Sequence, residues 1–257
     1  MTPDSPWFAR AFERAYLQLY AHRDASDAAR AIDFAVAVVG LDDRTRALDL
    51  ACGAGRHLAV LAPKVGRAVG LDFSMDLLER ARSDLKGART AVGARIGLVR
   101  ADMRRLPLAD AAFDLVLNLF TSFGYFEAEA ENRAVLAEVA RVLAPEGRFV
   151  LDHIHPPHLE RTLVPESRRE LDGGAIVVER RSFDRRTRRI EKEVVWLDPG
   201  EPGPTSWTES VRVFDPEELD SMLASAGLRA IQRYGDFDAS PLSDASPRQI
   251  VLAARER

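Results

Sequence analysis

The sequence predicts an α/β fold built on a mostly parallel β-sheet, and two observations lead to this prediction. Short apolar segments that lead to an acidic residue recur along the chain, at residues 47–50, 68–72 and 96–102. Segments with helical periodicity follow the first two of them, at residues 56–63 and 75–86. Strands that alternate with helices in this way are typical of a parallel sheet with helices on its faces.

The composition is that of a globular protein with no strong electrostatic partner. The chain has 257 residues, 46% of them hydrophobic, and a net charge of −4, which argues against a mainly electrostatic nucleic-acid binder. No segment approaches the roughly 18 apolar residues of a membrane helix, and the first ten residues lack a signal-peptide pattern. Cys52 is the single cysteine, so no intrachain disulfide can form. We expect a cytoplasmic protein without a membrane partner.

The turn after the first predicted strand carries the clearest ligand-binding signal, in the segment LDLACGAG at residues 48–55. Gly53 and Gly55 have no Cβ, which permits a tight turn and the close approach of a ligand. The helix that begins near Arg56 directs its first N–H groups toward this turn. Asp49, at the strand end, could pair with an ammonium group and would repel a phosphate.

The spacing of the next acidic residue favours a nucleoside ligand. Asp72 follows Gly53 by 19 residues, close to the spacing of a carboxylate that accepts hydrogen bonds from ribose hydroxyls. A dinucleotide fingerprint would also need a glycine at position 58, which is Leu58. This substitution weakens the alternative of a nicotinamide-dependent oxidoreductase.

These segments resemble motifs of the class I S-adenosylmethionine (SAM)-dependent methyltransferases of the small-molecule, UbiE/UbiG-like type. Residues 48–55 resemble motif I, usually LDLGCGxG, with Ala51 in place of the first glycine; GLDFSM at residues 70–75 resembles motif II. The resemblance covers most of residues 45–155. It implies a Rossmann-like, mostly parallel seven-stranded sheet with N-terminal helices and an antiparallel insertion after strand five. It also implies SAM as cofactor and methyl transfer to nitrogen or oxygen of a small-molecule acceptor.

The resemblance implies a set of cofactor-binding residues. Asp72 would bind the ribose, Asp102 would accept from the exocyclic amine of adenine, and Met103 would pack on the ring. Arg23 would offer a fork to the cofactor carboxylate, and Tyr16 or Tyr20 a ring face to the sulfonium; equally, the tyrosines could be core and Arg23 surface. The full set is Tyr20, Arg23, Asp49, Ala51, Gly53, Gly55, Asp72, Phe73, Asp102, Met103, Asn118 and Leu119.

The catalytic candidates follow strands four and five. Residues 120–126 contain three Phe and Tyr125, which would line a substrate pocket, pack beneath the cofactor or belong to the core. His153 and His155 share a face if strand five continues past residue 152. They could be a general base, structural histidines, or metal ligands together with His158 or Asp152; we expect no metal. A base is needed only if the acceptor arrives protonated.

The chain divides into three predicted parts. Residues 1–40 would form a helical cap, from helices at residues 6–21 and 25–39. Residues 41–158 and 215–257 would form the SAM-binding domain, with a helix at 132–143, strand five at 148–152, a helix at 216–227 capped by Asp215, and two last strands at 228–234 and 249–253. Residues 159–214 would form an antiparallel lid over the acceptor site, with strands at 175–178, 190–197 and 206–214.

The lid segment is rich in arginine, and its charge pattern leaves two interpretations. Glutamates interleave with the arginines, which favours a solvated hairpin with cross-strand ion pairs. Contact with an anionic substrate is the alternative, and a methyltransferase acting on RNA would need a continuous basic face here. The arginines are Arg180, Arg181, Arg185, Arg186, Arg188 and Arg189.

The expected partner is a small-molecule acceptor, with no nucleic acid, and the protein is expected to be a monomer or a homodimer. A non-catalytic SAM-binding module is a further alternative. Such a module would retain Asp49, Gly53 and Asp72 but would have a closed or absent acceptor pocket.

Overall fold

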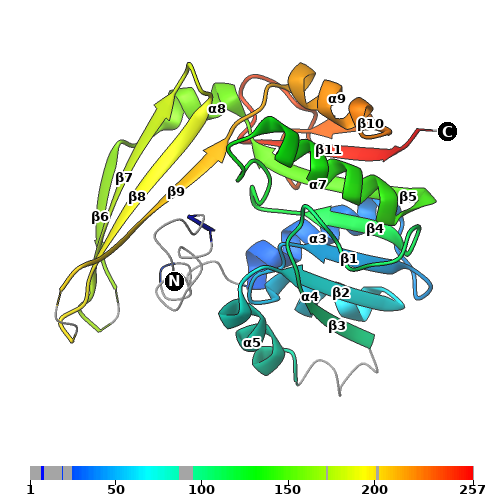
Figure 1. Ribbon diagram of the computed structural model, residues 1–257, viewed down its shortest axis with the longest axis horizontal. Coiled ribbons are helices and arrows are strands. Elements are labelled where there is room, and N and C mark those ends of the chain that lie inside the picture. The colour runs from blue at the N-terminus through cyan, green and yellow to red at the C-terminus, as the bar shows by residue number, and fades with distance from the viewer. Residues whose placement is uncertain are drawn as a thin grey trace.

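A computed structural model describes residues 7–8, 19, 25–86, 95–171, 173–200 and 203–256 of the protein. Its centre is a seven-stranded sheet with the order β10-β11-β5-β4-β1-β2-β3 (Figure 1). All neighbours are parallel except β11, which runs antiparallel to both β5 and β10. The predicted fold is therefore confirmed. The strands are β1 (Arg46–Leu50), β2 (Arg67–Asp72), β3 (Arg95–Arg100), β4 (Phe113–Asn118), β5 (Leu143–Ile154), β10 (Leu228–Tyr234) and β11 (Arg248–Arg255).

Helices cover both faces of this sheet because alternate strand residues are apolar on opposite sides. In β1, Leu48 packs in one core cluster together with α7 (Glu129–Val142) and α9 (Pro216–Ser225). Ala47 packs in the other cluster, with α3 (Ala25–Val39), α4 (Arg56–Leu61) and α5 (Met75–Asp84). The 3-10 helix η1 (Ala62–Lys64) extends α4, and α8 (Pro156–Thr162) follows β5.

The structure corrects two predicted features of this domain. The segment 144–147 does not separate α7 from strand five, because β5 begins at Leu143 and the proline-containing segment bulges within it. Leu143 pairs with Phe113 and Arg148 pairs with Leu115, so four residues of β5 are accommodated by one of β4. Asp215 precedes α9 as predicted, but its side chain pairs with Arg188 and makes no capping hydrogen bond.

A second, four-stranded antiparallel sheet interrupts the chain between α8 and α9. Its strands follow the order β6 (Glu166–Glu170), β7 (Ile176–Asp184), β8 (Arg189–Leu197) and β9 (Thr205–Arg212). We refer to it as the inserted sheet, and it extends to one side of the main sheet (Figure 1). β6 was not predicted, because all five of its residues are polar. Val177, Val194 and Trp196 pack with Leu19 of the N-terminal segment.

The predicted cross-strand ion pairs of the arginine-rich segment are confirmed. Arg180 of β7 lies 3.0 Å from Glu166 of β6 and 3.2 Å from Glu193 of β8, and Lys192 lies 2.7 Å from Glu209 of β9.

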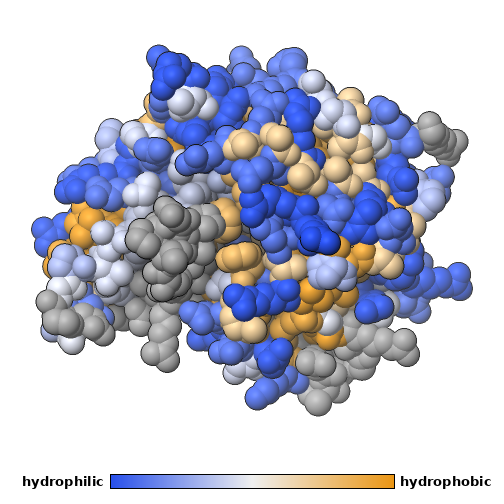
Figure 2. All heavy atoms as spheres, in the orientation of Figure 1, coloured by the Kyte–Doolittle hydropathy of each residue, from blue (hydrophilic) through white to orange (hydrophobic). Residues whose placement is uncertain are grey.

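Hydrophilic side chains dominate the face of the molecule seen in Figure 2. No helix of the described chain is long and apolar enough to span a membrane.

Replacing Gly70 by alanine tests the packing under the first turn. Gly70 lies in β2, and a Cβ there would lie 2.3 Å from Leu58 Cδ1 and 2.7 Å from Cys52 Sγ, both buried. We expect Gly70→Ala to lower the free energy of unfolding by about 1–3 kcal/mol, because the overpacked side chains must move. Chemical denaturation measures this change.

Gly97→Ala in the neighbouring strand is the matched control. A Cβ at Gly97 would meet Val69 at an ordinary contact distance of 3.5 Å. We expect a change within about 0.5 kcal/mol. Equal losses in the two variants would contradict the close contact of Gly70 with the turn.

Candidate functional site

The carboxyl ends of β1 to β4 meet at one edge of the main sheet and border a cleft. The cleft encloses an empty volume of about 590 Å³, part of it open to solvent. Its position is the usual ligand crevice of an open α/β sheet. The lining residues are Phe8, Ala51, Gly53, Leu71, Asp72, Phe73, Leu77, Ala101, Asp102, Met103, Ser122, Tyr125 and Phe126.

The turn after β1 has the backbone conformation that its glycines suggested. Gly53 and Gly55 have positive φ angles of 55° and 79°. Ala51 also has a positive φ, 63°, so it retains the left-handed conformation at a cost of roughly 1–2 kcal/mol. A Cβ on Gly55 would lie 3.1 Å from Ala81 of α5, which explains the need for glycine there.

Asp72 joins this turn to the end of β2. Its carboxylate accepts hydrogen bonds from the main-chain N–H of Gly53 at 2.8 Å and of Ser74 at 2.9 Å. Burial raises the pKa of Asp72, and the N–H groups of Ser74, Gly53 and Phe73 oppose that rise. Ser74 caps α5, since its hydroxyl accepts a hydrogen bond from the N–H of Leu77 at 3.3 Å. The carboxylate therefore holds two turns at the cleft.

Asp102 follows β3, lines the same cleft and is held by Arg104. The Nε of Arg104 lies 3.0 Å from one Asp102 oxygen, and the main-chain N–H of Arg104 donates to the same oxygen at 2.9 Å. Burial favours a higher pKa for Asp102, but the hydrogen bonds and charge of Arg104 keep its pKa below the usual value. Asp102 is thus an ionised acceptor with a fixed orientation.

Two buried polar atoms at the ends of β1 and β4 fit a ligand with a donor group. Asp49 is 1% exposed, and its Oδ2 has no hydrogen-bond partner among the described residues. Asn118 donates to the Leu50 carbonyl at 3.1 Å, but its Oδ1 also lacks a partner in the described chain. Because buried acceptors are normally satisfied, these atoms fit the cationic amino group of a cofactor. Burial raises the pKa of Asp49 to about 7, the charge of Arg56 opposing and that of Asp72 adding to the rise.

Aromatic side chains form one wall of the cleft. Tyr125 and Phe126 come from the segment 120–126, which leaves β4, and Phe8 comes from the N-terminal segment. The ring of Phe8 lies 5.5 Å from that of Phe126 and 5.6 Å from that of Phe73. The predicted contacts of Tyr16, Tyr20 and Arg23 lie outside the described residues.

An ion pair between the buried Asp152 and the partly exposed Arg248 holds the beginning of the segment 120–126. Phe120 and Thr121 have positive φ angles of 55° and 60°, which is unfavourable for non-glycine residues. Asp152 of β5 accepts from the N–H of Phe120 through its carboxylate at 2.8 Å and from that of Thr121 through its carbonyl at 3.1 Å. Arg248 of β11 pairs with the Asp152 carboxylate at 2.9 Å. The strained turn is thereby fixed from two strands.

A second cavity lies on the other side of this turn, with a volume of about 660 Å³ that is also partly open to solvent. Thr121 lines this cavity, whereas the next residue, Ser122, lines the first cleft. The two cavities therefore flank the same short segment. The second cavity is lined by Thr121, His153, Ile154, His158, Leu159, Thr162, Pro247 and Arg248.

The two predicted catalytic histidines lie in different surroundings. β5 ends at Ile154, so the strand does not continue to His155, which precedes α8 and places its Nδ1 2.9 Å from the Ser246 carbonyl. His153 is 1% exposed and packs against Phe214. Burial lowers the pKa of His153 to about 3, the Arg212 charge adding to the effect and the Arg212 main chain opposing it. Within the described chain, no three His, Cys, Asp or Glu side chains form a potential metal site.

The structure brings together six of the twelve residues predicted for the cofactor. Ala51, Gly53, Asp72, Phe73, Asp102 and Met103 line the cleft, together with the predicted catalytic residue Tyr125. Asp49, Gly55, Asn118 and Leu119 do not line it and lie at the ends of β1 and β4 and in the turn between β1 and α4.

Phe126 lines the cleft, which is one of the roles predicted for the aromatic residues of the segment 120–126, whereas five other lining residues were not predicted. Phe8 belonged to the predicted helix at residues 6–21, and Ser122 belonged to the segment 120–126. Leu71 and Ala101 are sequence neighbours of predicted residues, while Leu77 had no signal before α5 was placed.

Several known proteins are similar to this chain in sequence. A family model described as a methyltransferase domain matches residues 47–147. A demethylmenaquinone methyltransferase of Clavibacter sepedonicus is 31% identical over 73% of this chain and 66% of its own length. The dTDP-3-amino-3,6-dideoxy-alpha-D-glucopyranose N,N-dimethyltransferase of Streptomyces fradiae is 31% identical over 70% of this chain and 69% of its own length.

The chain belongs to the class I SAM-dependent methyltransferases. The SAM-bound structure of CalS10, an amino pentose methyltransferase from Micromonospora echinaspora, matches this methyltransferase with a TM-score of 0.68 and 27% identity, over 94% of this chain and 97% of that one. The methyltransferase uses SAM as its cofactor and transfers a methyl group to a small-molecule acceptor. The prediction from motifs I and II is confirmed.

The pKa of Asp49 predicts how SAM binding changes with pH. The value of about 7 lies above the ordinary one of about 3.9, so the folded protein holds a proton that the unfolded chain releases. This group therefore lowers the free energy of unfolding as the pH rises from about 4 to about 7. We expect the ionised form to bind the SAM ammonium, so calorimetry should show affinity rising about tenfold between about pH 5.5 and about pH 7.

Asp49→Asn is the matched variant for this prediction. The amide has the shape of the carboxylate but no titration in this range. We expect weaker SAM binding and the loss of most of the pH dependence. An unchanged pH dependence in Asp49→Asn would show that another group is responsible.

Proposed function

We propose that the methyltransferase methylates the amine nitrogen of a hydroxyl-bearing small molecule of the amino-sugar class, bound in the second cavity. The observation that carries this proposal is that consecutive residues, Thr121 and Ser122, line the second cavity and the cofactor cleft. Donor and acceptor must come close for methyl transfer, and the segment 120–122 is where the two spaces adjoin. The names of the relatives from Streptomyces fradiae and Micromonospora echinaspora, both concerning amino sugars, support the acceptor class.

The charge balance of the second cavity suits an uncharged, hydroxyl-bearing ring. Its cation, Arg248, is neutralised by Asp152 at 2.9 Å, with Asp236 at 3.7 Å. Thr121, Thr162 and His158 add groups that can donate and accept hydrogen bonds. We therefore expect the sugar ring to enter this cavity, whose described lining residues leave no charge unneutralised, and the diphosphate of a nucleotide-linked acceptor to stay outside it.

The chemistry asks for positioning of the amine more than for a strong base. SAM supplies a methyl group that is already activated by the sulfonium. An amine in a cavity without excess negative charge has a lowered pKa, which favours its free lone pair. His153 is held neutral by burial, and we propose that it accepts a hydrogen bond from the amine, with Tyr125 contacting the reacting groups from the cofactor side. His155, bonded to the Ser246 carbonyl, would hold the loop before β11 and take no part in proton transfer.

The same proposal assigns roles to the predicted parts of the chain. Residues 159–214 would act as the lid of the acceptor site, residues 1–40 as a cap over the cofactor, and residues 41–158 with 215–257 as the SAM-binding domain. A cytoplasmic location and a monomeric or homodimeric state stay predictions from the sequence.

A turnover assay tests the acceptor class. The enzyme is incubated with SAM and dTDP-3-amino-3,6-dideoxy-alpha-D-glucopyranose, and S-adenosylhomocysteine and methylated product are quantified by mass spectrometry. We expect methylation of the amino sugar and none of the 3-hydroxy counterpart. Preferential methylation of the hydroxy compound, or no turnover of the amino sugar, would contradict the proposed amine chemistry.

A pair of tryptophan substitutions tests the location of the acceptor. Leu159→Trp fills the second cavity, so we expect acceptor kcat/KM to fall at least about tenfold with SAM affinity unchanged. Val164→Trp, at a position that is 55% exposed and outside the cavity, is the control and should retain turnover. Thr162→Val removes a cavity hydroxyl with less steric change and should raise the acceptor KM. Normal turnover in all three variants would place the acceptor elsewhere.

A further inference from the structure

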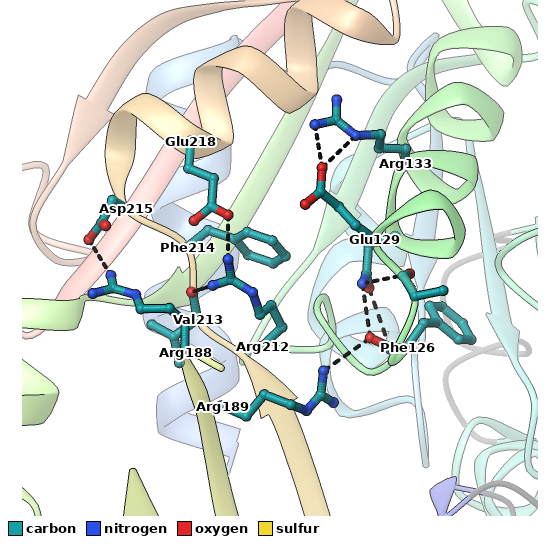
Figure 3. Close-up of polar contacts among 12 residues, drawn as sticks. Phe126, Glu129, Arg133, Arg188, Arg189, Arg212, Val213, Phe214, Asp215 and Glu218 are labelled. Atoms are coloured by element: carbon teal, nitrogen blue, oxygen red, sulfur yellow. Dashed lines mark hydrogen bonds and ion pairs between the residues drawn. The ribbon is translucent and has the colours of Figure 1, made fainter. Parts of the chain in front are cut away.

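Arg189 of the inserted sheet is bonded to the main chain of the segment that supplies the aromatic wall of the cleft, as the contact with Phe126 in Figure 3 shows. Arg189, the first residue of β8, donates through Nη1 to the Phe126 carbonyl at 3.1 Å and through Nη2 to the Tyr125 carbonyl at 3.4 Å. The same guanidinium donates to the hydroxyl and the carbonyl of Ser210 in β9, at 2.8 and 2.9 Å. One side chain therefore connects two strands of the inserted sheet to two residues that line the cleft.

The role of Arg189 differs from that of the other arginines of the inserted sheet. In the described chain, no carboxylate oxygen lies within 4 Å of its guanidinium, whereas Arg180 pairs with both Glu166 and Glu193. Burial lowers the pKa of Arg189, and its guanidinium N–H groups donate hydrogen bonds to carbonyls and a hydroxyl. Such contacts fix the position of the main chain and do not neutralise a charge.

A main-chain hydrogen bond near Arg189 also joins the inserted sheet to the segment 120–126. The N–H of Arg212, the last residue of β9, donates to the Gly124 carbonyl at 2.8 Å. Gly124 has a φ of +93°, and a Cβ there would lie 2.4 Å from the Arg212 carbonyl oxygen. The carbonyls of Gly124, Tyr125 and Phe126 therefore each accept a hydrogen bond from residues 188–189 and 210–212, which we call the base of the inserted sheet.

The base of the inserted sheet is itself anchored to the main domain, as Figure 3 shows. Arg188 pairs with Asp215, and Arg212 pairs with Glu218 of α9. The N-terminal segment joins at the same place, because Nε1 of Trp7 donates to the Tyr125 carbonyl at 3.3 Å. The N-terminal segment, through Trp7, and the inserted sheet, through Arg189, therefore both donate hydrogen bonds to the carbonyl of Tyr125, which lines the cleft.

We propose that Arg189 is a positioning residue for cofactor binding, through which the inserted sheet becomes part of the SAM site. It holds the Tyr125–Phe126 main chain so that the two rings form the cleft wall. SAM affinity then depends on a side chain in the inserted sheet. By linkage, bound SAM stabilises the base of that sheet to the same extent.

The experiment measures SAM binding by calorimetry in four variants of the full chain. Arg189→Met keeps most of the side-chain length but removes the donors, and we expect SAM to bind about tenfold more weakly. Arg189→Lys keeps one charge-assisted donor and should recover part of the loss. Arg180→Met removes an exposed arginine from the same sheet, and SAM affinity should stay within about twofold of wild type.

Val194→Ala controls for simple loss of stability. Val194 is fully buried in the core of the inserted sheet, so the variant destabilises the sheet by about 0.5–3 kcal/mol without touching the Tyr125–Phe126 carbonyls. Its SAM affinity should be close to that of wild type. Hydrogen exchange supplies a second readout: SAM should slow exchange at residues 210–212 in wild type but not in Arg189→Met.

Two results would overturn the proposal. One is SAM binding by folded Arg189→Met within twofold of wild type. The other is an equal loss of affinity in Val194→Ala, which would make the effect of Arg189 one of stability alone. Both readouts follow the cofactor only, so they are independent of the acceptor class proposed above.

Discussion

The cofactor cleft depends on one buried carboxylate, that of Asp72. A buried carboxylate is costly unless hydrogen-bond donors surround it, and here the donors are main-chain N–H groups of the turns that must be held. Gly53 donates from the turn after β1, and Ser74 donates from the turn after β2. Parallel pairing of β1 with β2 brings these turns to the same edge of the sheet. The carboxylate then fixes their spacing, and α4 and α5 begin from that fixed edge.

A second buried carboxylate, that of Asp152, holds a turn in the same way between β4 and β5. Asp152 accepts from the N–H of Phe120 and is balanced by Arg248, which lies 96 residues further along the chain. This pair maintains a turn that Phe120 and Thr121 would otherwise avoid, and the turn separates the cofactor cleft from the second cavity. Asp49 is the contrast: one of its oxygens has no partner among the described residues. Two buried acids thus build the site, and the third keeps an acceptor for a ligand.

The parts of the site that local sequence determines were predictable, and the parts that depend on tertiary contacts were not. Gly53, Asp72 and Met103 follow predicted strands at expected distances, so their convergence followed from the parallel sheet. His155 was placed with His153 only on the condition of a longer strand, and the proline after His155 begins α8 instead. β6 has no apolar residue to signal its pairing with β7. Arg189 stood within a run of six arginines, and nothing local distinguished it from Arg180; its contacts with the segment after β4 exist only in the folded chain.

If SAM binds in the cleft built around Asp72, its affinity depends on that carboxylate, and a calorimetric titration measures this dependence. SAM is titrated into wild type, Asp72→Asn and Asp114→Asn; Asp114 lies in β4 but pairs with Arg46 at the opposite end of the strand. We expect micromolar binding or better by wild type (about −8 kcal/mol), unchanged binding by Asp114→Asn and at least about tenfold weaker binding by Asp72→Asn. Equal affinity in the two variants, or no binding by wild type, would show that SAM does not bind at Asp72.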